Sequence, residues 1–303
     1  MKIAIAGATG FVGSRLVPQL QAQGHQVIIL TRSPQQASNR FGQAQIVGYN
    51  PLKSGEWQQS ISGCDAVINL AGEPIAEKRW TPAQKRSILD SRQLGTQKIV
   101  EAIDLATIKP QVLINASAIG YYGTSETSKF DETSPAGTDF LAEVCAAWET
   151  AAQAVTANGT RVVILRLGIV LGENGGVLGK MLAPFSAFVG GPIGSGNQWF
   201  SWIHRDDVVK LIIAALNDTK MQGVYNATAP NPTTMTEFAQ TLGTVMNRPS
   251  WLPVPNFALE AMLGEGAIVV LQGQQVVPTR TLAQGFNFQY STLKPALTAI
   301  LGS

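Results

Sequence analysis

Charged side chains, cysteine and histidine are all scarce in this chain of 303 residues. Lys, Arg, Asp and Glu supply 14% of the residues, whereas about 25% is usual in globular domains. The net charge is only +2 and no basic run stands out, so the composition does not favour a nucleic acid as a partner. Two histidines, His25 and His204, are too few for a histidine-based metal site, and we expect no metal.

The two cysteines, Cys64 and Cys145, form no CxxC motif and supply no disulfide framework, which indicates a reducing compartment. No apolar run approaches the roughly 18 residues that a membrane-spanning helix needs. Glycine and threonine break the apolar N-terminus at once, so a strand entering a turn explains it better than a secretion signal does. We therefore expect a soluble, cytoplasmic protein without a transit peptide, which acts on a small molecule and not at a membrane.

Hydrophobic residues nevertheless supply 45% of the chain, which is ample for a buried core. Through the first 170 residues, short apolar runs alternate with helical patterns. Strands are predicted at 2–6, 26–30, 66–70, 111–115 and 161–165, and helices at 11–23, 81–106 and 139–158. The pair Thr81-Pro82 is a typical helix start. This alternation indicates βαβ units, right-handed crossovers and a parallel sheet.

The first predicted strand runs into a glycine-rich turn, Gly7-Ala-Thr-Gly10-Phe-Val-Gly13. A GxxGxxG spacing between a strand and a helix is typical of a dinucleotide-binding loop. Gly7 permits the tight turn, Gly10 lets a pyrophosphate approach the backbone, and Gly13 lets the helix pack closely on the strand. The helix N-terminus then offers free N–H groups to the phosphates. A purely structural turn is the alternative; we predict a dinucleotide site.

The second predicted strand ends in Thr31-Arg32-Ser33. NAD sites usually have an acidic residue here, which bonds the ribose hydroxyls, and this chain has none nearby. A guanidinium can stack on adenine and pair with a 2′-phosphate. Arg32 therefore favours NADP(H) as the cofactor, although a solvated surface arginine is the alternative.

After residue 171 the composition changes, because glycine and proline are frequent in the segment 172–196. A helix is predicted at 206–216 and a strand at 224–227, and Thr234 with Glu237 three residues later predicts a capping box. We expect an α/β fold, a Rossmann doubly wound parallel sheet with a smaller, discontinuous C-terminal lobe. The predicted Rossmann domain is 1–170 plus about 204–229, and the predicted lobe is 171–203 and 230–303.

Motifs spread over the whole chain resemble the extended short-chain dehydrogenase/reductases, which include the NAD-dependent epimerase/dehydratases. The broad motifs are the glycine loop, the turn Asn69-Leu70-Ala71-Gly72 and the segment 202–207. More narrowly, the chain is similar to the atypical "epimerase family proteins", some of which are labelled cell-division-inhibitor-like. The narrower motifs are Ala71-Gly72-Glu73, Lys78-Arg79-Trp80, Ser91-Arg92, the loop 190–196, Gly273-Gln274, Val277-Pro278 and Gly285-Phe286.

This resemblance implies cofactor contacts from several turns that meet at one edge of the sheet. The implied residues are Gly7, Thr9, Gly10, Phe11 and Val12 at the pyrophosphate, Thr31 and Arg32 at the adenosine phosphate, Leu70, Ala71 and Gly72 at the adenosine and ribose, Arg92 at the cofactor phosphates and Val170 at the nicotinamide.

The resemblance also exposes a departure in the catalytic helix. The superfamily uses a tyrosine as acid/base, a lysine four residues later that lowers its pKa, and a serine that holds the substrate oxygen. Aligning Glu149 with the family's trailing glutamate puts Leu141 at the tyrosine position and Cys145 at the lysine position. Neither side chain can do that work.

Ser117 and Tyr121 are the remaining catalytic candidates. Counting back from Tyr122-Gly123, the usual serine position falls on Ala118, one residue from Ser117. A phenol without an adjacent ammonium suits acid/base chemistry poorly, so packing and substrate contact are alternative roles for both residues. In the related enzymes, the segment around His204 joins the two lobes and caps a helix.

Two segments are candidates for substrate contact. The first candidate is a charged and aromatic segment that suits an anionic or planar substrate, or else is a solvated loop; its residues are Glu73, Lys78, Arg79 and Trp80. The loop 194–198 offers backbone N–H groups and an amide from the second lobe.

Two functions stay open. One is an NADP-dependent oxidoreductase or epimerase-like enzyme with a non-standard acid/base and an unknown substrate. The other is a non-catalytic nucleotide-binding regulator or scaffold, in keeping with the division-related label.

Overall fold

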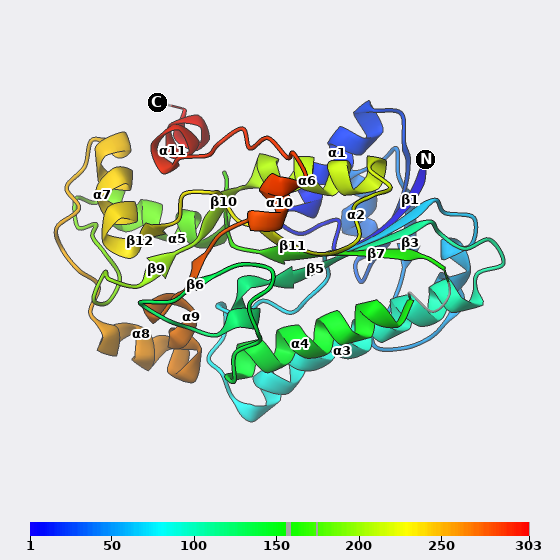
Figure 1. Cartoon of the computed structure of the whole chain (residues 1–303), viewed down its shortest axis with the longest axis horizontal. Helices are drawn as coiled ribbons and strands as arrows, with labels where there is room; N and C mark the ends of the chain where they lie inside the picture. Colours follow the sequence, from blue (N-terminus) through cyan, green and yellow to red (C-terminus); the bar gives the residue numbers. More distant parts are fainter. Residues whose placement is uncertain (156–158, 174, 303) are drawn as a thin grey trace.

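The computed structural model describes residues 1–155, 159–173 and 175–302. Its centre is a seven-stranded sheet in the order β11-β7-β5-β4-β1-β2-β3, in which every neighbouring pair is parallel. The strands are β1 (Lys2–Ala6), β2 (Gln26–Thr31), β3 (Gln45–Gly48), β4 (Ala66–Asn69), β5 (Val112–Ala118), β7 (Arg161–Leu167) and β11 (Gly223–Ala227). Helices lie above and below this sheet (Figure 1). The predicted doubly wound α/β fold is confirmed.

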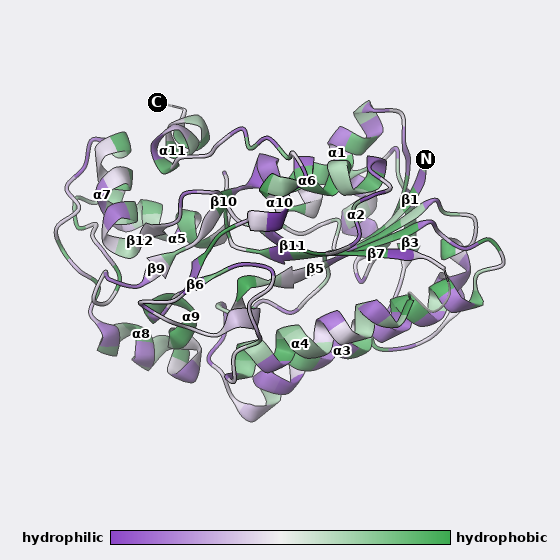
Figure 2. Cartoon of the chain, viewed as in Figure 1, coloured by the Kyte–Doolittle hydropathy of each residue, from purple (hydrophilic) through white to green (hydrophobic). Residues whose placement is uncertain are grey.

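Successive residues of β1 face opposite helical layers, because side chains alternate along a strand. Ile3 and Ile5 belong to the core beneath one layer, whereas Ala4 and Ala6 belong to the core beneath the other. Both faces are therefore apolar, as parallel sheets require, and Figure 2 shows the central strands largely in the hydrophobic colour. The main helices are α1 (Gly13–Ala22) and α6 (Arg205–Asn217) on one face, and α3 (Pro82–Leu105) and α4 (Phe140–Gln153) on the other.

The strand order reverses at β1. From β1 the chain passes through α1 to β2 and through α2 (Pro34–Arg40) to β3, then returns to β4 on the other side of β1. Ligands of open α/β sheets bind beyond the carboxyl ends of the strands at such a reversal. The glycine loop follows β1 and the turn 70–72 follows β4, so both lie at this point.

A separate apolar core joins α5 (Gly176–Ser186), α7 (Met235–Met246) and α11 (Leu293–Leu301) away from the sheet. The segments that form this core alternate along the sequence with segments of the sheet. The lobe boundaries given above stay a prediction. The remaining elements are η1 (Glu56–Ile61), η2 (Ile119–Tyr122), β6 (Lys129–Phe130), β8 (Ile169–Leu171), β9 (Trp199–Phe200), β10 (Trp202–His204), β12 (Thr233–Thr234), α8 (Asn256–Leu263), η4 (Gly264–Ala267), α9 (Ile268–Leu271), β13 (Gln275–Val276) and α10 (Thr279–Ala283).

Two predicted helix starts are confirmed. The Thr81 hydroxyl accepts the N–H of Gln84 at 3.2 Å at the start of α3. At the start of α7, the hydroxyl of Thr234 accepts the N–H of Glu237 and the Glu237 carboxylate accepts the N–H of Thr234. Each cap satisfies a backbone donor that has no partner within the helix.

Other boundaries differ from the prediction. The helix predicted at 139–158 ends at Gln153, and residues 156–158 lie outside the described residues. The helix predicted from Phe11 begins at Gly13. Both α2 and β3 were missed, because α2 is polar and buries only Ala37, and β3 has just four residues, none of them fully buried. Across the described ranges, no helix is both long and apolar enough to cross a membrane.

Candidate functional site

The glycine loop is shaped by steric contacts that exclude a side chain. Gly7 has a φ of +81°, and a Cβ there would lie 2.6 Å from the carbonyl carbon of Leu70. A Cβ on Gly13 would lie 2.4 Å from the carbonyl oxygen of Gly7. The N–H of Gly10 donates to that same oxygen at 3.0 Å, and both Thr9 and Gly10 are exposed. The loop is therefore a tight cradle of backbone that is open on its outer side.

The neighbouring turn after β4 is held by a buried amide. The Asn69 Nδ2 donates to Thr96 Oγ1 at 3.0 Å and to Asn115 Oδ1 at 2.7 Å. Its Oδ1 accepts the N–H of Ala71 at 3.2 Å, and the N–H of Leu70 donates to the oxygen of Ala6. These bonds fix residues 70–72 beside the glycine loop, and Gly72 is exposed.

The turn after β2 presents a cation and no acid. The Thr31 side chain is buried and its hydroxyl accepts the N–H of Ser33 at 3.1 Å, whereas Arg32 is exposed. In the described ranges, Arg32 forms no ion pair. This turn therefore has the chemistry of a phosphate site and lacks the carboxylate that would bond ribose hydroxyls.

Arg92 reaches the same edge of the sheet from α3. Its guanidinium carbon lies 5.1 Å from the ring centre of Trp148, and its Nη1 donates to the carbonyl oxygens of Glu73 (3.0 Å) and Ile88 (3.2 Å). A Cβ on Gly72 would lie 3.0 Å from the guanidinium carbon. Burial lowers the pKa of Arg92, and no carboxylate forms an ion pair with it within the described part of the chain. Such a cation is suited to an incoming anion.

The ring of Phe11 joins the glycine loop to the second half of the chain. Added Cβ atoms on Gly172, Gly175 and Gly176 would lie between 2.8 and 3.4 Å from this ring, and the Arg205 guanidinium carbon lies 4.9 Å from its centre. Val12 packs at the margin of the main core, as does Val170, which is in β8 opposite Ile203.

Ser117, one of the two predicted catalytic residues, belongs to a buried polar network. Its hydroxyl donates to Glu149 Oε1 at 2.7 Å, and Arg166 donates to both oxygens of that carboxylate at 2.8 Å. Ser117 is 1% exposed. The sequence interpretation did not single out Glu149 and Arg166 as a pair, although a charged residue inside the apolar run of β7 was a visible signal.

Tyr121, the other predicted catalytic residue, lies against this network. The Arg166 guanidinium carbon is 3.4 Å from the centre of the Tyr121 ring, and the side chain is half-buried. The adjacent Tyr122 is buried; its hydroxyl accepts from Arg166 at 2.9 Å and donates to Asn226 at 2.7 Å. Burial raises the pKa of Tyr122 to about 12. Tyr121 is thus the more accessible phenol of the two.

Leu141 and Cys145 lie on the face of α4 that packs against η2. A Cβ on Gly120 would lie 3.3 Å from Leu141 Cβ and 3.9 Å from Cys145 Sγ. Burial raises the pKa of the Cys145 thiol to about 11, so it is neutral near pH 7. Leu141 packs in an apolar cluster with Trp80 and Ile268. The two positions aligned with the tyrosine–lysine pair therefore have an apolar side chain and a neutral thiol, although the charged side chains of Arg92 and Glu149 lie near Cys145.

The segment 73–80 contacts residues from the second half of the chain. Arg79 Nη1 donates to the carbonyl of Ala261 at 3.0 Å, and Lys180 Nζ donates to the carbonyl of Ala76 at 2.9 Å. Lys78 pairs with Glu73 at 2.9 Å, which lowers the pKa of the Glu73 carboxyl. The Trp80 side chain is buried and its Nε1 donates to Ile75. Most of these polar groups already have partners within the fold.

The loop 194–198 is held by hydrogen bonds to other residues of the C-terminal half of the chain. The Gln198 amide nitrogen donates to Ile193 O at 2.9 Å and Val270 O at 3.1 Å, and the N–H of Gly194 donates to Val254 O at 2.9 Å. Gln198 is 2% exposed. The backbone bonds fix the shape of the loop and place this amide in the interior.

His204 has the structural role expected of it. Its Nδ1 accepts the N–H of Asp206 at 3.0 Å and thereby caps α6, and its ring lies 4.0 Å from that of Tyr290. The side chain is buried, which lowers its pKa. Among the described residues, no group of three or more His, Cys, Asp and Glu side chains is arranged to hold a metal ion.

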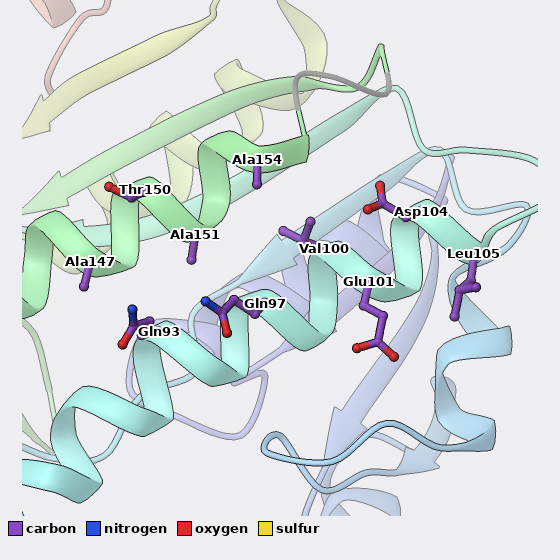
Figure 3. Close-up of a pocket in the computed structure, with 10 residues that line it drawn as sticks. All are labelled: Gln93, Gln97, Val100, Glu101, Asp104, Leu105, Ala147, Thr150, Ala151 and Ala154. Atoms are coloured by element: carbon purple, nitrogen blue, oxygen red, sulfur yellow. The ribbon is translucent and has the colours of Figure 1, made fainter.

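A groove of about 420 Å³ lies elsewhere, between α3 and α4. Figure 3 shows Ala147 and Ala151 of α4 facing Gln97 and Val100 of α3 across it. None of the predicted cofactor residues lines this groove, so it is distinct from the edge of the sheet where those residues gather.

Comparisons with known proteins agree with this architecture. A model of the "NAD dependent epimerase/dehydratase family" matches residues 3–228, and a model of a domain of unknown function, DUF1731, matches residues 254–300. The epimerase family protein SDR39U1 homolog, chloroplastic, from Arabidopsis thaliana is 50% identical, over 99% of this chain and 87% of that protein. The human epimerase family protein SDR39U1 is 38% identical, over 99% of this chain and 100% of that protein.

Solved structures extend the likeness to three dimensions. The human epimerase family protein SDR39U1 (isoform 2), determined with NADPH, matches with a TM-score of 0.91 and 37% identity, covering 100% of this chain and 99% of that one. A UDP-glucuronic acid 4-epimerase from Bacillus cereus matches with a TM-score of 0.81 at 18% identity, covering 100% and 98% of the two chains, which shows the fold alone. The resemblance drawn from the sequence motifs is confirmed: the chain belongs to the NAD dependent epimerase/dehydratase family.

Proposed function

We propose that this protein binds NADP(H) and is an oxidoreductase or epimerase-like enzyme acting on a small molecule. The observation that carries the proposal is the backbone cradle after β1, where side chains on Gly7 or Gly13 would collide with neighbouring backbone. Its N–H groups and the start of α1 are suited to a pyrophosphate. The cofactor, when bound, supplies or accepts the hydride.

The choice of NADP(H) over NAD(H) rests on the turn after β2. Arg32 is exposed there and no carboxylate is nearby in sequence. The human relative crystallised with NADPH supports the same choice. Arg92 is a second cation at this edge of the sheet, and it would meet the cofactor phosphates beside Gly72.

Tyr121 is our candidate for substrate contact or proton transfer. It follows β5 at the carboxyl edge of the sheet and is half-buried, whereas the Ser117 hydroxyl donates to Glu149 and is enclosed. A reaction here would proceed without the tyrosine–lysine pair, because Leu141 and Cys145 occupy the positions aligned with it.

Isothermal titration calorimetry with NADPH and NADH tests the cofactor assignment. We expect wild type to bind NADPH more tightly than NADH, and Arg32→Ala to weaken NADPH binding by about 1–3 kcal/mol, the range for a lost charge-assisted hydrogen bond. Binding of neither nucleotide by the folded protein would remove the proposal. Oxidation of NADPH in the presence of a panel of aldehydes and ketones then tests catalysis, with Tyr121→Phe as the matched variant.

A non-catalytic nucleotide-binding regulator or scaffold is the second candidate function. The observation that favours it is the apolar surrounding of Leu141 and the neutral thiol of Cys145. Tight NADPH binding without turnover of any substrate in the panel would support this candidate over the enzyme.

A further inference from the structure

The first 55 residues contain no Asp or Glu, but they contain Lys2, Arg15, Arg32, Arg40 and Lys53. This stretch forms β1, α1, β2, α2 and β3, which is the whole half of the sheet on one side of the reversal. The outer edge of the glycine loop therefore has positive charge supplied by its own unit. The acids that face this unit come from elsewhere in the chain: Asp206 pairs with Arg15, and Glu73 interacts electrostatically with Arg32.

Arg40 differs from a simple surface cation in the direction of its side chain. It is the last residue of α2, and its Nη1 reaches the carbonyl oxygen of Thr9 in the glycine loop at 3.4 Å. Its guanidinium carbon lies 5.3 Å from the ring centre of Phe41, which is buried and fixed in the core. The side chain thus bridges the end of α2 and the exposed face of the loop.

Arg40 and Arg32 approach the same corner from two sides. β1 and β2 are adjacent and parallel, with Ala6 opposite Leu30, so the loop containing Thr9 and the turn containing Arg32 leave the sheet side by side. In the part of the chain that the structure describes, neither arginine forms an ion pair, whereas Arg15 pairs with Asp206 at 2.7 Å.

An alternative role for Arg40 is simply to stabilise the C-terminal end of α2. A cation in the last turn of a helix is favoured by the helix dipole. Such an interaction would leave the guanidinium at the carbonyls that end α2, whereas its hydrogen bond goes to Thr9. Arg40 and Arg32 are both exposed, and two arginines can bind one phosphate with charge-assisted hydrogen bonds.

We infer that Arg40 is a second specificity-determining residue for the 2′-phosphate of NADP(H), acting with Arg32 as a two-arginine clamp. The inference rests on the proposed function and deepens it. Because NAD(H) lacks this phosphate, Arg40 contributes to the binding of one cofactor and not to that of the other.

The test measures binding and needs no substrate. NADPH, NADH, adenosine 2′-monophosphate and adenosine 5′-monophosphate are titrated into wild type, Arg40→Ala and Arg40→Lys. Arg86→Ala is the matched control, since Arg86 is an exposed arginine on α3 that pairs with Asp90. We expect Arg40→Ala to weaken NADPH and adenosine 2′-monophosphate about tenfold, to leave the other two ligands within about twofold, and to be partly rescued in Arg40→Lys.

Each other outcome overturns the inference in a recognisable way. Equal weakening of NADPH and NADH means that Arg40 only holds the loop through Thr9. Unchanged NADPH binding in Arg40→Ala means that Arg32 acts without it. Both results leave the proposed function intact, whereas failure of wild type to bind either dinucleotide overturns the proposed function as well. Circular dichroism melts of the variants establish that each is folded.

Discussion

Glu149 and Arg166 form a buried, bidentate ion pair, with both donor–acceptor distances at 2.8 Å. Glu149 comes from α4 and Arg166 from β7, so the pair ties the helix that carries Leu141 and Cys145 to the carboxyl ends of the strands. Ser117 and Tyr122 complete it, because each donates or accepts one further hydrogen bond with the pair. These four side chains therefore satisfy one another's hydrogen bonds within the protein.

We predict that Glu149→Gln destabilises the protein by about 3–5 kcal/mol, because it leaves the buried Arg166 guanidinium without a counter-charge. Urea unfolding monitored by circular dichroism measures this. Asp90→Asn is the control, since it breaks the exposed Arg86–Asp90 pair and should change the free energy of unfolding by less than about 1 kcal/mol. Similar effects of the two substitutions would contradict the structural role assigned to Glu149.

Gly7 and Gly24 allow the steric demand of the glycine loop to be separated from backbone strain. Both have positive φ, +81° and +79°, but a Cβ at Gly24 would meet nothing within 4 Å, whereas one at Gly7 would strike Leu70. Gly24→Ala should cost about 1–2 kcal/mol from strain alone, and Gly7→Ala should cost more and abolish nucleotide binding. Thermal melts and NADPH titration of both variants check this, and equal effects would contradict it.

The fold was predictable where the sequence pattern is strong and local. Strands such as Lys2–Ala6 are continuous apolar runs, and helix starts such as Thr81-Pro82 have their capping chemistry within four residues. By contrast, α2 and β3 lie at the edge of the sheet and bury little, so their sequences lack a hydrophobic pattern. Elements that are held by tertiary contacts alone leave a weak local signal.

The candidate site was predictable only in part, for a related reason. Gly7 and Gly13 were recognisable because their spacing between a strand and a helix is itself a local sequence pattern, although the backbone that excludes a side chain at Gly7 is that of Leu70, far away in sequence. The pairing of Ser117 with Glu149, and of Glu149 with Arg166, joins residues 32 and 17 positions apart. No local pattern encodes such a meeting, since the topology of the sheet brings the strands together.

Cys145 should be an unreactive thiol in the native protein. Burial raises its pKa to about 11, so little thiolate exists at pH 8, and burial also raises the pKa of Cys64. We predict that an aromatic disulfide reagent labels neither cysteine of the folded protein at pH 8 and labels both in guanidinium chloride. Rapid labelling of Cys145 in the native state would contradict its burial. Cys145→Ala and Cys64→Ala identify which thiol reacts.

His204 should make stability depend on pH in the mildly acidic range. Burial lowers its pKa in the folded state, so the unfolded chain binds the proton more readily. Its contribution is therefore fully present above the unfolded value of about 6.5, and it is lost as the pH falls toward the lower folded pKa. We predict that the free energy of unfolding falls between pH 7 and pH 5 by less in His204→Gln than in wild type. Urea unfolding of both proteins at each pH measures this. Parallel curves for wild type and His204→Gln would show that the histidine does not titrate against folding.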